Sequence, residues 1–369
     1  MAESASDTFI DDPRDGADDL AAAWIGQVLE GRYRVDSVLG AGGFAVVFRA
    51  RHLALGRDVA VKMLQPQKGD QTVLARFHRE ADVLARLQHP GIVAATDYGV
   101  SGATPFLVME LVEGRTLRDV IDEARPPIEH TLAITRQMLR ALAYAHAQGV
   151  LHRDLKPGNV VLSTPDVAAG EDADPAVKVL DFGLAKLARG GARAEASITA
   201  DGVAFGTPGY VSPEVLLGRP ADARSDLFAV GVMLFEMLVG HRPHGMLSRG
   251  EELRATVTAT APSLAEVAPG LRCGAELDAV LQLALARDPA ERFSDAASML
   301  AALEQIDPER RTAPSVQRAR ASKTEGSTPA AASWRQAQVP LPIVLVAVAV
   351  PTVLAAFLAV ALLAVLLVD

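Results

Sequence analysis

The sequence feature that most constrains this chain is a short polar segment at residues 151–159, which reads Leu-His-Arg-Asp-Leu-Lys-Pro-Gly-Asn. Asp-Phe-Gly follows at residues 181–183. The carboxylates of Asp154 and Asp181 and the amide of Asn159 are hard oxygen donors of the type that Mg²⁺ prefers. A His-Arg-Asp tripeptide alone is usually a solvated polar turn. The ordered set at these offsets, however, is hard to obtain by chance.

This ordered set resembles the catalytic loop and the metal-binding motif of eukaryotic-type protein kinases. The resemblance implies transfer of the γ-phosphoryl group of ATP to a hydroxyl. Asp154 would orient that hydroxyl, while Asn159 and Asp181 would bind Mg²⁺, for which Mn²⁺ can substitute. Lys156 stands where the serine/threonine branch of the family has a lysine that reaches the transferred phosphate. The acceptor is therefore expected to be a Ser or Thr hydroxyl of a protein substrate.

A glycine-rich segment precedes these motifs and would cover the ATP phosphates, because glycine lets a backbone approach a phosphate closely. It follows a strand-like stretch at residues 33–38 and fits the family pattern except at Ala45, where the family has glycine. A dinucleotide-binding turn would open directly into a helix. Here residues 46–50 and 59–62 indicate two further strands instead, with Lys62 on one face. The segment consists of Leu39, Gly40, Ala41, Gly42, Gly43, Phe44, Ala45, Val46 and Val47.

Residues 73–87 are predicted to form a helix with one apolar face. That face consists of Leu74, Phe77, Ala81, Leu84 and Leu87, which recur at helical spacing. Glu80 falls on the same face, and a buried carboxylate is costly unless it is paired. The resemblance implies that Lys62 is its partner, in a pair that holds the α- and β-phosphates. In an isolated helix Glu80 could equally extend from the rim of the stripe into solvent.

Residues 106–111 resemble the stretch that ends at the hinge between the two lobes of a kinase. By this resemblance, Met109 is the gatekeeper beside the adenine pocket. The backbone from Glu110 to Val112 would then hydrogen-bond the purine edge. Residues 106–109 also have the composition of a core strand, and the two interpretations are compatible.

The stretch from Asp181 to Glu214 has the length and the punctuation of a kinase activation segment. By resemblance, Thr207 lies near the catalytic aspartate and helps to position the substrate. Ser197 and Thr199 are candidate phosphorylation sites, although each could simply solvate a loop. Arg153 precedes the catalytic aspartate and could pair with such a phosphate, which would order the loop.

Two structural contacts are also implied by the resemblance. Glu214 is expected to pair with Arg292, which lies in Arg-Asp-Pro-Ala-Glu-Arg-Phe. Residues 227–239 are apolar nearly all round, and this composition predicts a fully buried helix. Asp226, at the start of this segment, would hydrogen-bond the backbone of the catalytic loop. It could also act as an ordinary helix N-cap.

Composition divides the chain into parts. Kinase-like sequence covers residues 33–304, with a small lobe at about 33–111 and a large lobe at about 112–304. Residues 1–30 are predicted to be an acidic, disordered tail, because the first 23 residues carry a net −6 of the chain's −9. Since most of the net charge belongs to this tail, the net charge of the chain gives no indication of nucleic-acid binding. The single cysteine, Cys273, predicts no internal disulfide and a reducing compartment.

The segment 343–368 is uncharged over 26 residues and is predicted to be a transmembrane helix. At about 1.5 Å per residue it exceeds a hydrocarbon core of roughly 30 Å. Residues 305–342 read as a flexible basic linker that favours the cytoplasmic side and contact with membrane lipid. Because only Asp369 follows the span, we expect insertion after synthesis is nearly complete and no folded external sensor.

The sequence therefore predicts an α+β fold: a two-lobed protein kinase, β-rich in its small lobe and helical in its large lobe, followed by one C-terminal transmembrane helix. It resembles a membrane-anchored bacterial serine/threonine kinase of the eukaryotic-like (Hanks) class, with its kinase domain in the cytoplasm, ATP and protein substrates as partners, and a homodimer as a compatible state. The alternatives are a membrane-anchored pseudokinase scaffold and a simple membrane adaptor. The complete set Lys62, Glu80, Asp154, Asn159 and Asp181 speaks against the scaffold, and only Ala45 speaks for it.

Overall fold

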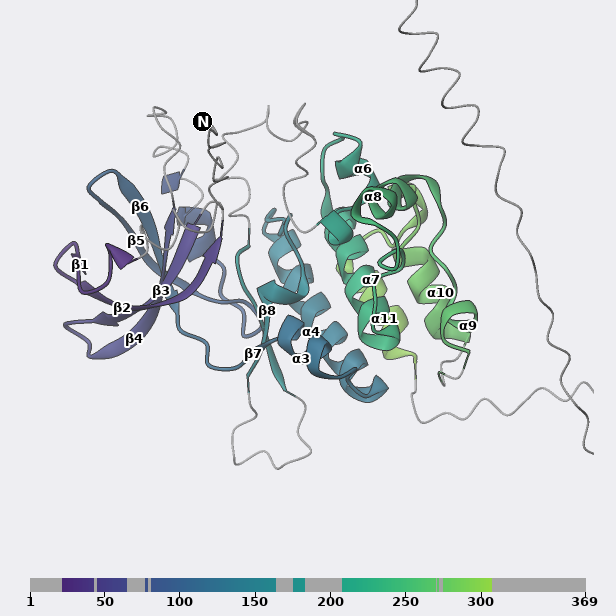
Figure 1. Ribbon diagram of the computed structural model, residues 1–369, viewed down its shortest axis with the longest axis horizontal. Helices are drawn as coiled ribbons and strands as arrows, with labels where there is room; N and C mark the ends of the chain where they lie inside the picture. Colours follow the sequence, from purple (N-terminus) through teal and green to yellow (C-terminus); the bar gives the residue numbers. More distant parts are fainter. Residues whose placement is uncertain are drawn as a thin grey trace, which may run out of the picture. The chain divides into compact units, whose positions relative to one another are not determined.

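The computed structural model describes residues 22–42, 45–64, 77–78, 81–163, 175–182, 208–269, 271 and 275–306 (Figure 1). The chain divides into two compact units, residues 1–313 and 314–369, and every described residue belongs to the first. The predicted membrane segment 343–368 lies outside the described residues. Within the described part of the chain, no helix combines the length and the apolar character that a membrane crossing needs.

The small lobe is built on a six-stranded antiparallel sheet with the strand order β1-β2-β3-β4-β6-β5. In β3, buried and half-buried residues alternate, as expected for a sheet that covers a core on one face. Phe48, Val61 and Phe106 are fully buried in that core. The strands are β1 (Val28–Leu29), β2 (Tyr33–Gly42), β3 (Ala45–His52), β4 (Arg57–Leu64), β5 (Ala95–Ser101) and β6 (Thr104–Glu110).

Residues 22–30 belong to this lobe, so the prediction of a disordered tail over residues 1–30 is wrong for them. Leu29 is fully buried, and Trp24 packs against the same core. The Gly26 N–H donates to Val35 O at 2.8 Å, and Glu30 Oε1 accepts the Val100 N–H at 2.9 Å. Apolar side chains after the acidic run therefore extend the sheet by one short strand. Residues 1–21, which carry a net −6 of the chain's −9, lie outside the described residues.

The predicted helix over residues 73–87 is helical in its described part, at residues 77–78 and 81–85. Phe77 and Ala81 are fully buried, and Leu84 and Leu87 are buried as well, so the described members of the predicted apolar face do face the core. Leu74 and Glu80 lie outside the described residues.

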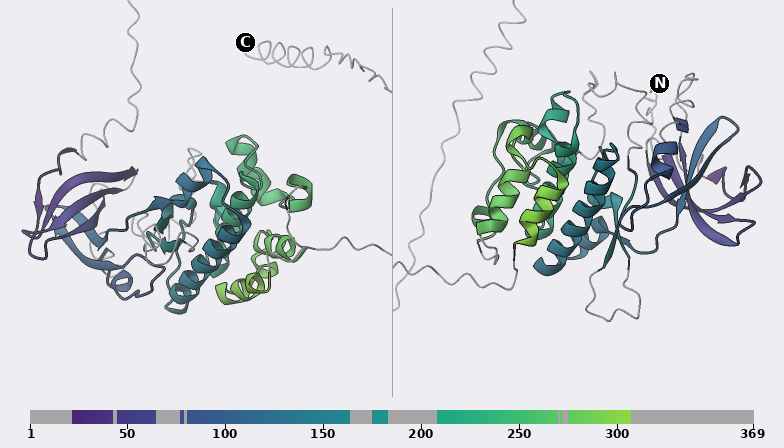
Figure 2. Two further views of the ribbon diagram at one scale, coloured as in Figure 1. Left: turned by 90° about the horizontal axis from the view of Figure 1, so that it is seen from below. Right: turned by 180° about the vertical axis from the view of Figure 1, so that it is seen from behind.

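The large lobe is helical, with a three-stranded antiparallel sheet in the order β7-β8-β9. Strands β7 (Arg115–Thr116), β8 (Val160–Ser163) and β9 (Ala176–Val179) make up the sheet, and β8 and β9 flank the segment 164–174. Helix α11, yellow-green in Figure 2, packs against α4. The helices are α3 (Leu117–Glu123), α4 (Ile128–Ala147), α6 (Pro213–Leu216), α7 (Ala223–Val239), α8 (Arg249–Thr258), α9 (Leu264–Val267), α10 (Ala275–Ala284) and α11 (Ala296–Glu304).

Helix α7 is the buried centre of this lobe, as its composition predicts, because every residue from Ser225 to Leu238 is buried. Its first residue is Ala223. Asp222 caps it, accepting the Arg224 N–H at 2.8 Å and forming a capping box with Ser225. The alternative N-cap role for Asp226 is therefore wrong. Asp226 lies one turn inside the helix, where its carboxylate is free to bond elsewhere.

The structure brings Glu214 and Arg292 together in a buried ion pair. Arg292 Nη1 and Nη2 lie 2.9 Å and 2.7 Å from the two oxygens of Glu214. Arg292 Nε also donates to Ala286 O at 2.7 Å, and the guanidinium lies over the Phe228 ring at 4.9 Å. Burial alone would raise the pKa of the Glu214 carboxyl, but the hydrogen bonds from Arg292 and Ser225 hold it below its usual value. This pair fixes the end of the activation segment to the lobe.

We predict that Arg292→Met lowers the free energy of unfolding by about 3–5 kcal/mol, because it leaves the buried Glu214 carboxylate without its partner. Arg140→Met is the matched control. Its pair with Glu304 lies at the surface, with side chains 50% and 46% exposed, and such pairs contribute under about 1 kcal/mol. Urea unfolding of both variants measures the difference. Equal, small losses would show that the Glu214–Arg292 pair does not stabilise the lobe.

Candidate active site

The carboxylate of Asp226 in α7 holds the backbone of the predicted catalytic loop. Asp226 Oδ1 accepts the Arg153 N–H, and Oδ2 accepts the His152 N–H, each at 2.9 Å. His146 Nε2, at the end of α4, lies 2.8 Å from the same Oδ2. Burial would raise the pKa of Asp226, but the hydrogen bonds from the His146 ring and from the His152 backbone N–H outweigh it and hold the pKa below its usual value. Asp226 is therefore a buried anion that fixes two consecutive backbone amides.

The His152 side chain connects the predicted catalytic loop to Leu180, the residue before the Asp-Phe-Gly motif. Burial lowers its pKa, so the ring is neutral and carries one donor and one acceptor. His152 Nε2 lies 2.7 Å from Leu180 O, and Nδ1 accepts the Asp154 N–H at 3.3 Å. Since a carbonyl can only accept, the proton sits on Nε2. The ring also packs against Phe182 at 4.8 Å.

Asp154, Lys156 and Asn159 lie together, as the resemblance implies. Lys156 Nζ is 2.8 Å from Asp154 Oδ2. Asn159 Nδ2 donates to the Asp154 backbone carbonyl at 2.7 Å and approaches its Oδ2 at 3.4 Å. Because the amide nitrogen of Asn159 is used within the loop, its Oδ1 is the atom that can face a cation. The Leu180 N–H donates to Asn159 O at 2.8 Å, which joins this loop to Asp181.

Lys62 of β4 reaches the second motif directly. Its Nζ lies 2.7 Å from Asp181 Oδ2, with the two side chains 13% and 23% exposed. Asp181 has a φ of 62°, a left-handed conformation that is unfavourable for an aspartate and is typical of functional sites. The predicted partner of Lys62, Glu80, lies outside the described residues, so that pair stays a prediction. The contact that the structure does describe is the Lys62–Asp181 ion pair, which connects the small lobe to the predicted metal ligand Asp181.

The described oxygen ligands suit a hard cation that keeps part of its hydration shell. Within the described ranges, no group of three or more His, Cys, Asp or Glu side chains could hold a metal ion. Magnesium typically takes one or two carboxylates from the protein and completes its octahedron with substrate phosphates and water. Asp181 supplies one carboxylate, and the backbone hydrogen bond from Leu180 to Asn159 joins it to the loop that carries the Asn159 amide, which fits that pattern.

The glycine-rich segment forms the β2–β3 hairpin, with Gly42 opposite Ala45. Gly40 has no other atom within 4 Å of the position that a Cβ would occupy, and its φ is not positive. Neither packing nor backbone conformation therefore requires glycine there, and the predicted close approach of a phosphate to Gly40 stays a prediction. Gly43 and Phe44 lie outside the described residues.

The predicted hinge follows β6. Met109 is buried opposite Ala60 of β4. The Glu110 N–H donates to Ala94 O at 3.0 Å, and the Glu110 carboxylate lies 2.6 Å from Lys178 Nζ. The N–H of Glu110 is thus occupied, so a purine would meet the Glu110 carbonyl and the backbone of residues 111 and 112.

The described end of the predicted activation segment, from residue 208 onwards, is also fixed. Tyr210 OH donates to Glu236 Oε2 of α7 at 2.5 Å. Arg118 Nη1 of α3 lies 3.0 Å from Glu236 Oε1 and 3.2 Å from Tyr210 OH. Thr207, Ser197 and Thr199 lie outside the described residues, so their roles stay predictions.

Sequence reasoning missed the two histidines that support the loop. Nothing in the local sequence indicates the partners of these histidines, because Asp226 lies 80 residues from His146 and Leu180 lies 28 residues from His152. Only the place of His152 in the His-Arg-Asp tripeptide could have pointed to a role in the loop.

Comparisons with known proteins agree with this geometry. The family model described as "Protein kinase domain" matches residues 33–312. The chain is 40% identical over 281 residues to serine/threonine-protein kinase PknL of Mycobacterium tuberculosis, which covers 76% of the chain and 66% of PknL. It is 35% identical to the kinase pkn3 of Myxococcus xanthus, over 82% of the chain and 54% of pkn3. The chain thus spans less than two thirds of these relatives' own length.

A solved structure shows the same fold. The crystal structure of the Mycobacterium tuberculosis PknI kinase domain superposes with a TM-score of 0.58 at 28% identity. The match covers 76% of this chain and 97% of the PknI domain.

We predict that Asp226→Asn loosens the catalytic loop. An amide offers a single acceptor atom where the carboxylate has two, so one of the buried N–H groups of His152 and Arg153 loses its partner. Leaving such a group unsatisfied costs about 1–3 kcal/mol. Hydrogen exchange should therefore accelerate at these two amides. Unchanged exchange, with unchanged stability, would contradict the role of Asp226 as the support of the loop.

Proposed function

Because the chain belongs to the protein kinase family, we propose that it transfers the γ-phosphoryl group of ATP to serine or threonine hydroxyls of proteins. One observation carries the proposal. The contacts of Asp226, His152 and Leu180 place Asp154, Asn159 and Asp181 in a single connected cluster, and Lys62 reaches that cluster from the other lobe. Phosphoryl transfer needs this kind of arrangement, with positioned charges and little covalent participation by the protein.

Each side chain has a distinct task in this reaction. Asp154 accepts a hydrogen bond from the acceptor hydroxyl and orients its oxygen towards the γ-phosphorus of ATP. It takes the proton as the new O–P bond forms and the bond from the γ-phosphorus to the bridging oxygen breaks, which releases ADP. Lys156, 2.8 Å from Asp154, places a positive charge beside the transferred phosphoryl oxygens. Lys62 is positioned to leave Asp181 for the phosphates of ATP. Asp181 and Asn159 would hold Mg²⁺, which neutralises the charge that develops on the phosphates.

The acceptor class rests on Lys156, on Thr207 and on the relatives, which are named serine/threonine-protein kinases. The pseudokinase scaffold remains the second candidate, because Ala45 departs from the glycine pattern. Asp154 contacts Lys156 and Asn159, and Lys62 pairs with Asp181, so the described members of the catalytic set are present, which favours transfer over binding alone.

We predict that the full-length chain phosphorylates itself on Ser or Thr in the presence of Mg²⁺ and ATP. Asp154→Asn and Lys62→Met should each reduce transfer below detection. The first removes the carboxylate that orients the acceptor hydroxyl, and the second removes the ammonium group that binds the ATP phosphates. Incorporation of γ-labelled phosphate measures the effect. An equally active Asp154→Asn protein would contradict the mechanism. A wild type that binds ATP but transfers no phosphate would establish the scaffold instead.

Phosphorylation of the activation segment is a second prediction. Arg153, whose φ of 67° is left-handed, holds its unusual backbone position next to Asp154 through the Asp226 hydrogen bond. A phosphate on Ser197 or Thr199 could pair with its guanidinium and order the loop. Replacing both hydroxyl residues with Ala should lower activity towards an added substrate several-fold. Unchanged activity of the double variant would show that the loop orders itself without phosphate.

We further propose that residues 343–368 anchor the kinase to the cytoplasmic membrane, with its catalytic domain in the cytoplasm. Their uncharged length supports a span, and the basic residues at 310–335 support this orientation, because such residues favour the cytoplasmic side. The active site also requires cytosolic ATP.

Deleting residues 339–369 should move the protein from the membrane fraction to the soluble fraction with its kinase activity intact. Fractionation followed by an activity assay tests this. A truncated protein that still sediments with membranes after a high-salt wash would contradict the anchor. Digestion of the kinase domain by protease added outside intact cells would contradict the orientation.

A further inference from the structure

The Glu110 carboxylate, at the end of β6, binds two separate parts of the chain. Its Oε1 accepts a hydrogen bond from Lys178 Nζ of β9 at 2.6 Å and another from the Ala94 N–H at 3.0 Å. The Glu110 N–H in turn donates to Ala94 O at 3.0 Å. Within the described part of the chain, Glu110 is the one carboxylate within ion-pair distance of Lys178. Lys178 therefore connects the start of the predicted hinge to the large lobe.

Strand β9 gives this lysine a fixed position in the large lobe. Gln137 of α4 accepts the Val177 N–H at 3.1 Å through its Oε1 and donates to Pro175 O at 3.0 Å through its Nε2. Strand β9 also pairs with β8, where Val161 lies opposite Lys178. The backbone around Lys178 is thus held by both α4 and β8. Its ammonium group is therefore a fixed reference for the Glu110 carboxylate.

The stretch 111–114, which follows Glu110, is held at its far end as well. A Cβ on Gly114 would lie 2.4 Å from Leu162 O of β8, so the chain passes directly against that strand. Strands β8 and β9, which are paired neighbours, thus hold the two ends of this stretch. The backbone that a purine would meet lies between these two attachments.

The exposure of the Lys178–Glu110 pair indicates a role in position more than in stability. The side chains of Lys178 and Glu110 are 23% and 35% exposed, and solvent screens an ion pair at this depth, so it contributes modestly to the free energy of unfolding. Loss of the pair should therefore leave the protein folded. What it changes is the attachment of Glu110 to β9.

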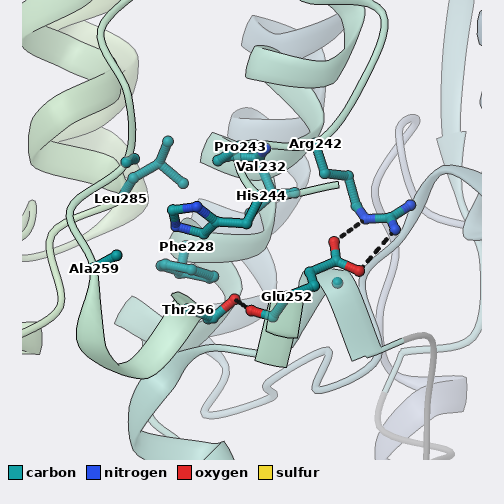
Figure 3. Close-up of a pocket in the computed structure, with 11 residues that line it drawn as sticks. Phe228, Val232, Arg242, Pro243, His244, Glu252, Thr256, Ala259 and Leu285 are labelled. Atoms are coloured by element: carbon teal, nitrogen blue, oxygen red, sulfur yellow. Dashed lines mark hydrogen bonds and ion pairs between the residues drawn. The ribbon is translucent and has the colours of Figure 1, made fainter. Parts of the chain in front are cut away.

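A second charged pair of the large lobe provides a comparison (Figure 3). Arg242 Nε and Nη2 lie 2.6 Å and 2.9 Å from the two carboxylate oxygens of Glu252 in α8. The hollow beside this pair, into which His244 points, has a volume of about 10 Å³ and room for no more than one water molecule. No larger ligand fits there, so the Arg242–Glu252 pair serves the packing of the lobe.

We propose that Lys178 is a positioning residue for the purine of ATP. Through Glu110 it sets the backbone of residues 110–112 relative to the large lobe. Within the described ranges, Lys178 makes no hydrogen bond or ion pair with the predicted metal ligands Asn159 and Asp181. Its loss should therefore weaken binding of the purine and leave binding of the phosphates unchanged. The inference rests on the proposed function, because it concerns the binding of ATP in that same reaction.

Lys178→Met in the full-length chain tests the proposal, with Arg242→Lys as the control. Calorimetric titration measures the Kd of Mg²⁺–ATP and of Mg²⁺–tripolyphosphate, which has the phosphates but no purine. Lys178→Met should raise the Kd of Mg²⁺–ATP about tenfold, because ordering a loosened hinge costs binding free energy. The Kd of Mg²⁺–tripolyphosphate should stay within about twofold of the wild type. Arg242→Lys loses the bidentate fork, so it should lower the melting temperature and leave both Kd values within about twofold.

Two further variants make the test specific. Lys178→Arg keeps a charged donor for Glu110, so its Kd for Mg²⁺–ATP should lie within about threefold of the wild type. In Glu110→Gln the amide oxygen can still accept from Lys178 and Ala94, so the same Kd should rise by an intermediate factor. If Lys178→Met does not fold, Glu110→Gln decides, because an unchanged Kd for Mg²⁺–ATP in that variant overturns the proposal.

The other outcomes separate this inference from the proposed function. An unchanged Kd for Mg²⁺–ATP in folded Lys178→Met would overturn the inference alone. An equal rise in the Kd of Mg²⁺–tripolyphosphate would also overturn it, because a merely structural pair would affect both ligands. A wild type that binds no Mg²⁺–ATP would overturn the proposed function and this inference together.

Discussion

The structure depends first on the buried carboxylate of Asp226. A charge in the core of the large lobe is costly unless hydrogen bonds satisfy it. Here the partners are the backbone amides of His152 and Arg153 and the ring of His146. Because α7 is buried along almost its whole length, the carboxylate is a rigid reference point. The catalytic loop takes its position from that point, including the left-handed conformation of Arg153.

Short polar contacts connect the loop that Asp226 holds to the residues around Asp181. The neutral His152 ring bonds Leu180 O, and the Leu180 N–H bonds Asn159 O, so the residue before Asp181 is held on both sides. Asp181 in turn meets Lys62 across the lobes. The predicted catalytic carboxylate, the predicted metal ligands and the predicted phosphate-binding lysine are therefore parts of one hydrogen-bonded network. The pair Glu214–Arg292 holds the end of the predicted activation segment.

The sequence predicted what depends on local spacing. The strands of the small lobe, the apolar face of the helix at 77–85 and the buried α7 each have a periodicity or a composition that can be counted. Family resemblance supplied the cluster around Asp154 and the partner of Glu214. Other contacts between distant residues, such as His146–Asp226 and Lys62–Asp181, were not predicted. Residues 22–30 looked like the end of an acidic tail, because only the folded sheet offers a site for Leu29. The start of α7 was misplaced by four residues, because the apolar run begins at Leu227 while the cap that the folded helix uses is Asp222. The partners of His152, Lys62 and Arg242 likewise have no local signature.

The central claim is that this network is arranged for a metal–nucleotide complex, with Lys62 held by Asp181 until the phosphates arrive. A crystal structure of the kinase with Mg²⁺ and a non-hydrolysable ATP analogue tests this most directly. We expect Lys62 Nζ to leave Asp181 for the phosphates, Asp181 and Asn159 Oδ1 to bind the metal, and the Asp226 hydrogen bonds to the catalytic loop to stay unchanged. A bound nucleotide with Lys62 still on Asp181, and with the metal held by other residues, would contradict the account.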